Sequence, residues 1–308
     1  MQIIADMQFH LLVLVVGYMF SAFMGIPLRF YFGLPLRRKI HARVHRMGKK
    51  LNQRSIATRV WRGLVVVILL LIPCFITDWV LGSAGFFAGI IIAMSADIQP
   101  SLWHGWAAVG AAKGQNEARL TLAVSKLALE PQSAPDHHGK LRLIILTLTH
   151  HFSMTLVGGA FWFGLLGLKG LLGYYVLATA AHYFRESEEE WKAFGWAATR
   201  LFTLVDIVPS LIAALFLIVA SIFVPKAKPF AALKAFLSVS SEHHVHIVAA
   251  ALSISLGGPR IINGTTLQTP WIGTGTAQIE ADSMARFMVL FSIALFGFLT
   301  LLLFLTTL

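Results

Sequence analysis

The chain is 308 residues long, and 57% of its residues are hydrophobic while only 13% are charged. Soluble domains usually contain about 25% charged residues, so this composition excludes an ordinary soluble enzyme and predicts an integral membrane protein. The formal net charge is +11. Because its densest basic block lies directly between two apolar segments, the charge indicates a membrane surface, and no nucleic-acid partner is expected.

Apolar segments predict an all-α integral membrane protein with five to seven spanning helices. Each segment approaches the roughly 20 apolar residues that a bilayer requires. The run Leu143–Phe184 is too long for one helix, and Lys169 with Gly170 predicts a turn between two. The short run Ala84–Met94 is either a return span or a re-entrant element. The other predicted spans are Leu11–Phe32, Leu64–Leu81, Leu201–Val224 and Phe287–Leu305.

A basic loop separates the first two predicted spans. Ten Lys or Arg and no Asp or Glu stand between Arg37 and Arg62. Such a block beside a spanning helix is typical of a cytoplasmic loop that faces anionic lipid headgroups. We therefore expect a multi-pass protein of a bacterial-type inner membrane, with a periplasmic N-terminus. Within the loop, Arg37–Leu51 fits either a helix at the membrane interface or a solvated basic segment.

Two soluble insertions are expected within a single membrane domain over residues 1–308, at about residues 97–140 and 225–282. In the first, apolar residues at helical spacing predict a helical pair over Ser101–Leu129. In the second, a helix is predicted over Ala231–Leu237, followed by a tail rich in Gly, Thr and Pro. The sequence leaves homo-oligomerisation open.

Several common site signatures are absent from the sequence: G-x-x-x-x-G-K-[ST], H-E-x-x-H, paired C-x-x-C and G-x-S-x-G. A P-loop nucleotide site, the strongest zinc motifs and a nucleophile elbow are therefore not supported. Twelve histidines are present, but no third ligand stands at a defined spacing, so the metal ligands stay unknown.

Ionisable residues within apolar sequence are the candidate catalytic residues. Such groups are costly at membrane depth, so they face a polar cavity or, near a helix end, reach the headgroup layer. Both interpretations remain open for these four residues, which are His150, His151, His182 and Asp206.

A motif rich in glycine and proline lies near the C-terminus. It reads Leu256-Gly257-Gly258-Pro259-Arg260, then Asn263-Gly264, then Thr269-Pro270-Trp271-Ile272-Gly273. Glycines permit positive φ and the close approach of backbone N–H groups to an anion or to a packed neighbour. Prolines fix the intervening turns. The pattern predicts a structured loop suited to ligand binding.

These residues resemble the C-terminal signature of the cobinamide-phosphate synthase family of cobalamin biosynthesis (CobD/CbiB). Further stretches are similar to that family in the same order: Pro27-Leu28-Arg29, Phe161-Trp162, Phe194-Gly195-Trp196-Ala197-Ala198, Arg200-Leu201, Asp206 and Pro209. The resemblance extends from about residue 20 to about residue 290. It implies an amide-forming synthase that joins adenosylcobyric acid, a corrinoid, to an aminopropanol phosphate, with ATP and Mg²⁺. The substrate-binding residues that it implies are Arg29, Gly257, Gly258, Pro259, Asn263, Gly264, Pro270 and Gly273.

The chain departs from the family pattern at acidic positions. Where the family has Glu-Asn the chain has His150 and His151, and further positions with acidic residues in the family are Met154, Ala181, Phe202 and Thr203. Magnesium prefers oxygen ligands, so we expect the synthase activity to be divergent or impaired, with Mg²⁺ and ATP required only if the family activity is retained. The alternative hypothesis is a non-catalytic sensor or regulatory protein similar to AmpE membrane proteins.

Overall fold

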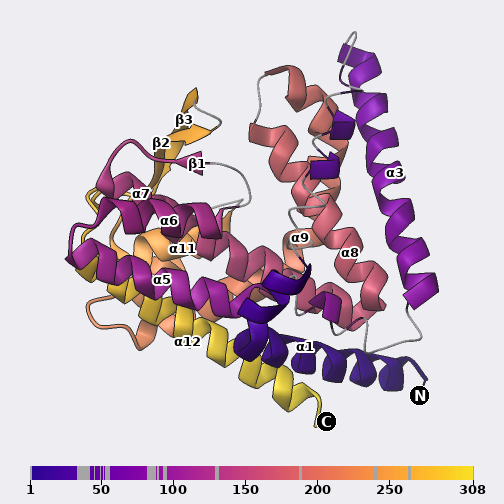
Figure 1. Cartoon of the computed structure of the whole chain (residues 1–308), viewed down its shortest axis with the longest axis horizontal. Coiled ribbons are helices and arrows are strands. Elements are labelled where there is room, and N and C mark those ends of the chain that lie inside the picture. The colour runs from indigo at the N-terminus through magenta and orange to yellow at the C-terminus, as the bar shows by residue number, and fades with distance from the viewer. Residues whose placement is uncertain are drawn as a thin grey trace. The chain divides into compact units, whose positions relative to one another are not determined.

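The computed structural model of the chain describes residues 2–32, 42–44, 46–48, 50, 52, 56–81, 88, 90–92, 96–128, 132–186, 189–238, 242–262 and 265–307 (Figure 1). The predicted basic segment Arg37–Leu51 and the run Ala84–Met94 lie largely outside these residues. The chain divides into two compact units. Unit 1 comprises Met1–Asp97, Met154–Pro209 and Leu302–Leu308, and unit 2 comprises Ile98–Ser153 and Ser210–Leu301.

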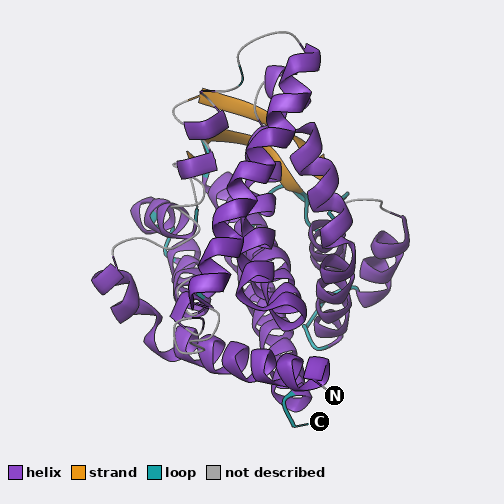
Figure 2. Cartoon of the chain, turned by 90° about the vertical axis from the view of Figure 1, so that its right-hand side faces the viewer, coloured by secondary structure: helices purple, strands orange, loops and turns teal. Residues whose placement is uncertain are grey.

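Long apolar helices confirm the predicted fold class, and helices dominate the chain in Figure 2. Within the described residues, five helical stretches are long and apolar enough to cross a membrane. The chain is therefore a multi-pass, all-α membrane protein. The five stretches are Asp6–Phe23, Thr58–Leu81, His137–His182, Ala193–Ile222 and Ala281–Leu305.

Unit 1 is built around α8 (Gly159–Glu186), which packs against both α1 (Gln2–Phe32) and α3 (Ile56–Leu81). The first part of α9 (Glu189–Ile222) completes this unit. Gly63 permits a very close approach of α3 to α9, because a Cβ at that position would overlap the carbonyl oxygen of Phe194. Helices that approach this closely commonly have small residues at the contact.

The long helical stretch breaks at Gly167, not at the predicted turn of Lys169 and Gly170. Gly167 has φ 67° and ψ −150°, a conformation open to glycine and strained for other residues. The break frees backbone N–H groups at the start of the following helical segment. One of them, the N–H of Lys169, donates to Oδ1 of Asp78 on α3 at 3.2 Å. Nζ of Lys169 lies 3.6 Å from Oδ2 of the same carboxylate.

Unit 2 contains the predicted helical pair, as α5 (Ile98–Lys113) and α6 (Glu117–Leu127). Asn116 begins α6 by accepting the N–H of Arg119 on its side-chain oxygen, which is the usual role of asparagine at this position. α7 (His137–His150) continues into a π-helix, η1 (His151–Gly158), and so into unit 1. The remaining helices are α10 (Pro229–Ser238), α11 (His243–Leu252) and α12 (Ala281–Leu305).

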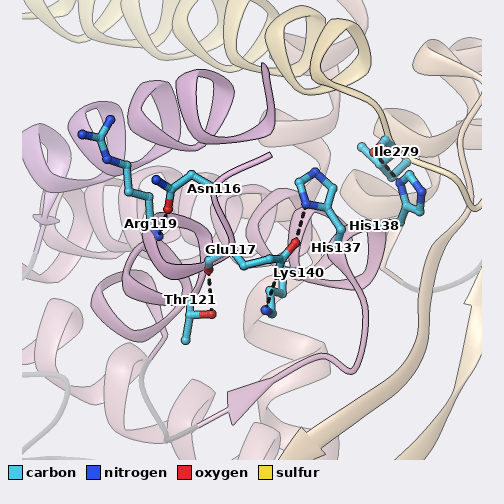
Figure 3. Close-up of polar contacts among 8 residues, drawn as sticks. All are labelled: Asn116, Glu117, Arg119, Thr121, His137, His138, Lys140 and Ile279. Atoms are coloured by element: carbon cyan, nitrogen blue, oxygen red, sulfur yellow. Dashed lines mark hydrogen bonds and ion pairs between the residues drawn. The ribbon is translucent and has the colours of Figure 1, made fainter. Parts of the chain in front are cut away.

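Charged side chains join α6 to α7 (Figure 3). Glu117 accepts hydrogen bonds from Nζ of Lys140 and from Nδ1 of His137, the latter at 2.6 Å. These two bonds, with that from Lys140 the stronger, hold the pKa of Glu117 below its ordinary value. His138 instead turns to the chain before α12, where Nδ1 lies 2.8 Å from the carbonyl oxygen of Ile279.

A small antiparallel sheet, in the order β1-β2-β3, is the non-helical part of unit 2. Its strands are β1 (Gln132–Ser133), β2 (Leu256–Ile262) and β3 (Thr265–Ile272), and β2 packs against α7. The sequence analysis expected a structured loop where β2 and β3 form a hairpin. The Gly- and Pro-rich sequence lacks the alternation of apolar and polar residues that predicts strands, although the exposure of the side chains does alternate over Thr266–Pro270.

Candidate functional site

The motif residues lie on the β2–β3 hairpin, around a bulge. Gly257 pairs with Trp271 and Gly258 pairs with Thr269, so Pro270 is the extra residue of β3. Proline suits a bulge because it has no N–H to donate to the ladder. Gly257 and Gly258 have φ of 81° and 80°, which requires glycine or strain. Oγ1 of Thr269 donates to the carbonyl oxygen of Gly258 at 2.7 Å and fixes the bulge.

The ring of Trp271 explains why Gly258 has no side chain. A Cβ at Gly258 would lie 2.5 Å from the indole, well inside contact distance. Trp271 is still 51% exposed, so much of its ring faces outward from the hairpin. The glycine therefore accommodates a packed neighbour, which is one of the two roles that its sequence context predicted.

Arg142 of α7 lies against this ring. Its guanidinium carbon is 5.0 Å from the centroid of the Trp271 ring, within the range of a cation–π contact. The Arg142 side chain is only 6% exposed, and its guanidinium donates to the carbonyl oxygen of Ala277. Nη2 lies 3.5 Å from Oδ1 of Asp136, while Nε has no hydrogen-bond partner among the described residues. A buried guanidinium therefore lies beneath the hairpin, and its Nε–H has no hydrogen-bond partner among the described residues.

Gly273 anchors the end of the motif to α11. It has φ 95°, and a Cβ there would lie 2.8 Å from the Cβ of Ala249 on α11 and 2.6 Å from the carbonyl oxygen of Ile254, just after that helix. The single O–H of Ser255 is shared between the carbonyl oxygens of Gly273 and Gly275, which lie 3.1 and 2.9 Å from Oγ. These bonds join the chain just before β2 to the chain just after β3. Of the remaining candidates, Pro259 lies on β2, whereas Asn263 and Gly264 lie outside the described residues.

Two histidines that the sequence placed far apart meet in unit 2. Nδ1 of His150 on α7 and Nε2 of His244 on α11 are 3.0 Å apart. Nδ1 of His244 is buried without a partner among the described residues. A buried lone pair costs less than a buried unpaired N–H, so we assign the proton to Nε2 of His244, which donates to His150. Burial, followed by the nearby His150, lowers the pKa of His244 well below its ordinary value.

The adjacent histidine points elsewhere. Nδ1 of His151 lies 3.3 Å from Oγ of Ser101 on α5, and both side chains are buried. His150 and His151 therefore have different partners on different helices. Neither contact provides a nucleophile that a substrate could reach, because Ser101 is 2% exposed.

The other two catalytic candidates belong to unit 1. Asp206 on α9 accepts a hydrogen bond from the hydroxyl of Tyr174 on α8, at 2.6 Å. Tyr174 is buried, and a Cβ at Gly158 would lie 2.3 Å from its hydroxyl oxygen. His182 is exposed on α8. The four candidates are thus divided between the two units, two in each. Arg29 lies in α1, and its side chain is not among those that the structure describes.

The described residues do not fit a magnesium site. No group of three or more His, Cys, Asp or Glu among them could hold a metal ion. The carboxylate of Asp206 is engaged by Tyr174, and the surrounding positions lack the hard oxygen ligands that Mg²⁺ prefers. We assign no described residue to a metal or to the phosphates of ATP.

Three residues that the sequence analysis did not select are prominent at these sites, namely Arg142, Tyr174 and His244, while Trp271 was named only as part of the motif. Arg142 did give a sequence signal, since it is a single cation at the start of the apolar run Leu141–Leu148. Tyr174 gave none, because tyrosine is common in spanning helices and its partner is on another helix.

Comparison with known proteins decides the family. A family model described as CobD/Cbib protein matches residues 14–291. The chain belongs to the CobD/CbiB family. This match confirms the resemblance that the motifs indicated, and it includes the whole β2–β3 hairpin. No solved structure matches the chain.

Individual relatives of the CobD/CbiB family agree with this assignment. The chain is 32% identical over 181 residues to the cobalamin biosynthesis protein CobD of Sinorhizobium fredii, covering 55% of each protein, about half of that relative's length. It is 28% identical to a protein of the same name from Sinorhizobium sp, over 76% of this chain and 79% of the relative. The Brucella anthropi protein of that name is 24% identical, over 92% and 93%.

Proposed function

We propose that this chain acts in cobalamin biosynthesis, as a divergent synthase of the CobD/CbiB family that binds a corrinoid carboxylate in the inner membrane. The observation that supports the proposal is the family match over residues 14–291, which includes the folded hairpin of Gly257, Gly258, Pro270 and Gly273. The relatives are named for cobalamin biosynthesis.

The charge beneath the hairpin suits an anionic substrate. The guanidinium of Arg142 is buried, its partner Asp136 is 3.5 Å away, and that carboxylate is half exposed to solvent. A cation that is incompletely neutralised attracts carboxylates and phosphates, both of which occur in the substrates that the family resemblance implies. We propose that the hairpin orients the acidic group of the corrinoid or the phosphate of the amine, and that Arg142, whose side chain is only 6% exposed, acts from beneath through its charge without contacting the substrate.

The reaction proposed is amide formation between a corrinoid carboxylate and the amine of an aminopropanol phosphate. ATP would supply the activation of the carboxylate, as the family resemblance implies: a carboxylate oxygen would take a phosphoryl or nucleotidyl group from ATP. The amine would then displace that group as phosphate or nucleotide, and would lose one proton as the C–N bond forms. Since the described residues do not fit Mg²⁺, we expect the rate to be much lower than that of an authentic family enzyme. The AmpE-like alternative has no specific observation in its favour.

Complementation tests this function. The full chain is expressed in a cobalamin auxotroph that lacks the authentic synthase and is grown on cobyric acid without cobinamide. We expect weak growth that is lost in the Gly258→Ala variant. Absence of growth despite normal membrane expression would remove the synthase assignment and favour the regulatory alternative. If the wild-type chain supported growth at the rate given by the authentic enzyme, and Asp206→Ala abolished that growth, the expected impairment of the synthase activity would be contradicted.

A further inference from the structure

Helix α10 follows closely on a membrane-spanning helix. The spanning stretch of α9 ends at Ile222, and α10 begins at Pro229. Between them the chain is compact, since the N–H groups of Phe223, Val224 and Ala227 all bond to carbonyls three residues earlier. Seven residue steps extend at most about 25 Å, and these turns make the real reach shorter. The start of α10 is therefore held near the end of the span.

One face of α10 is covered by α11. Ala232 is fully buried, and the ring of Phe236 lies 5.4 Å from that of His243, at the start of α11. The N–H of Lys228 donates to the carbonyl oxygen of Ala251 at 2.8 Å, which fixes the opposite end of the pair. α10 is thus anchored to unit 2, and its orientation about its own axis is set.

The opposite face of α10 is apolar and exposed. Phe230 is 86% exposed, Leu237 is 76% exposed, and Leu233 lies between them on the same stripe. Spacings of three and four residues place these side chains on one side of a helix. The end of α9 continues the pattern with exposed Ile222 and Phe223. Exposed apolar side chains gathered next to a span mark a surface that contacts the membrane or another protein.

The charged residues of the segment that carries this stripe are all lysines. Lys226, Lys228 and Lys234 are exposed, and no Asp or Glu stands between Asp206 and Glu242. Lysines that flank an apolar stripe beside a span fit an anionic lipid surface, where the alkyl stems lie along the apolar layer and the ammonium groups reach phosphates.

We propose that α10 lies in the interfacial layer of an anionic leaflet. Phe230, Leu233 and Leu237 enter the boundary of the acyl chains, and Lys226, Lys228 and Lys234 bind the phosphates of anionic lipids. The residues that the sequence placed in a soluble insertion thus include a membrane-bound helix that anchors unit 2 beside α9. This inference is independent of the proposed function.

Spin-label accessibility in nanodiscs tests the inference on the full chain. Cys74 is the single cysteine, so Cys74→Ala provides a background for the surface variants Phe230→Cys and Leu237→Cys. Both labels should be accessible to oxygen and shielded from a water-soluble nickel reagent when the nanodisc contains anionic phosphatidylglycerol. Replacing Lys226, Lys228 and Lys234 by Gln should raise the ratio of water-exposed to lipid-buried label by about fivefold per lysine. Neutral phosphatidylcholine should have a similar effect.

The matched control replaces Lys113, Arg119 and Lys126 by Gln, which removes three exposed charges from α5 and α6. It should leave both labels in lipid. Nickel-accessible labels in anionic nanodiscs would overturn the proposal. Spin–spin broadening between two copies would overturn it in favour of a dimer contact. If the depth of the two labels in the bilayer depended neither on lipid charge nor on the three lysines, the proposed role of the anionic lipids would be overturned.

Discussion

Nε2 of His244 on α11 lies 3.0 Å from Nδ1 of His150 on α7, and the other ring nitrogen of His244 is buried without a partner among the described residues. With the proton of His244 assigned to Nε2, this nitrogen donates to His150. A second proton on His244 would place an unpaired N–H and a charge in this interior. The pair therefore holds α11 to α7 in the neutral form.

Stability should depend on pH because of His244. Its pKa is lower in the folded chain than its ordinary value of 6.5, and burial lowers the pKa of His246 in the same direction. The unfolded chain then binds more protons below pH 6.5, so stability is complete above that pH and decreases as the pH falls below it. The slope is up to about 1.4 kcal/mol per pH unit for His244. The contribution of the partly exposed His246 is smaller, because solvent screens it. The unfolding midpoint in detergent, measured between pH 8 and pH 5, checks this.

The variant His244→Gln keeps a donor toward His150 but does not titrate. We expect it to be close to the wild type in stability at pH 8 and to lose most of the decrease at pH 5. His182→Gln, at an exposed histidine of unit 1, is the control and should retain the wild-type pH dependence. An unchanged pH dependence in His244→Gln would show that this ring is not the titrating group.

Gly258→Ala should abolish function without affecting membrane insertion. The residue has φ 80°, and a Cβ would lie 2.5 Å from the indole of Trp271. Strain in this region costs about 1–3 kcal/mol, and the steric overlap adds to it. The unfolding midpoint and complementation measure the effect. The double variant Gly258→Ala/Trp271→Ala should recover part of the stability, because it removes the overlap but not the backbone strain.

Gly110→Ala provides the control for this glycine, because no atom lies within 4 Å of the position of its Cβ. It should be neutral or slightly stabilising in helix α5. A Gly258→Ala variant with wild-type stability and growth would reduce the hairpin to a passive connector.

Arg142→Lys should weaken the hairpin although it conserves the charge. Lysine lacks the planar fork that contacts the carbonyl of Ala277, the carboxylate of Asp136 and the ring of Trp271 together. We expect a loss of about 1–3 kcal/mol, as for a hydrogen bond to a charged group, measured as a lower unfolding midpoint. Arg119→Lys on the exposed surface of α6 should have no effect. Equal midpoints for both variants would contradict the role given to Arg142.

Tyr174→Phe should destabilise unit 1 through Asp206. The variant removes the 2.6 Å hydrogen bond and leaves a half-buried carboxylate without this donor, which costs about 1–3 kcal/mol. Asp206→Asn keeps an acceptor oxygen for Tyr174 and should be close to the wild type. Tyr175→Phe loses a hydrogen bond to the carbonyl oxygen of Thr155, and the resulting loss of stability should be the same whether residue 206 is Asp or Asn. A double-mutant cycle between residues 174 and 206 that gives no coupling energy would show that the hydrogen bond between Tyr174 and Asp206 does not stabilise unit 1.

Sequence patterns predicted the helices because hydrophobic length and helical spacing are local properties. The spans and the pair over Ser101–Leu129 appear as α5, α6 and the five long apolar stretches. The break in the long stretch was displaced to Gly167, since the side chain that accepts the freed N–H, Asp78, is on another helix. No local pattern reports such a partner.

The candidate site was predictable only in part for the same reason. The glycines of the hairpin were evident from sequence, but the ring that Gly258 accommodates pairs with it across a bulge. The contact of His150 with His244 joins residues that are 94 positions apart. Tertiary contacts of this kind depend on how the helices pack, which composition and periodicity do not specify.

Equilibrium binding of a corrinoid tests the central claim most directly. The full chain in nanodiscs is titrated with cobyric acid, and the change in the visible absorbance of the corrinoid gives the bound fraction. We predict saturable binding that is weakened in Gly258→Ala and in Arg142→Lys and unchanged in Gly110→Ala. An absence of saturable binding by correctly inserted wild-type protein would contradict a role in cobalamin biosynthesis.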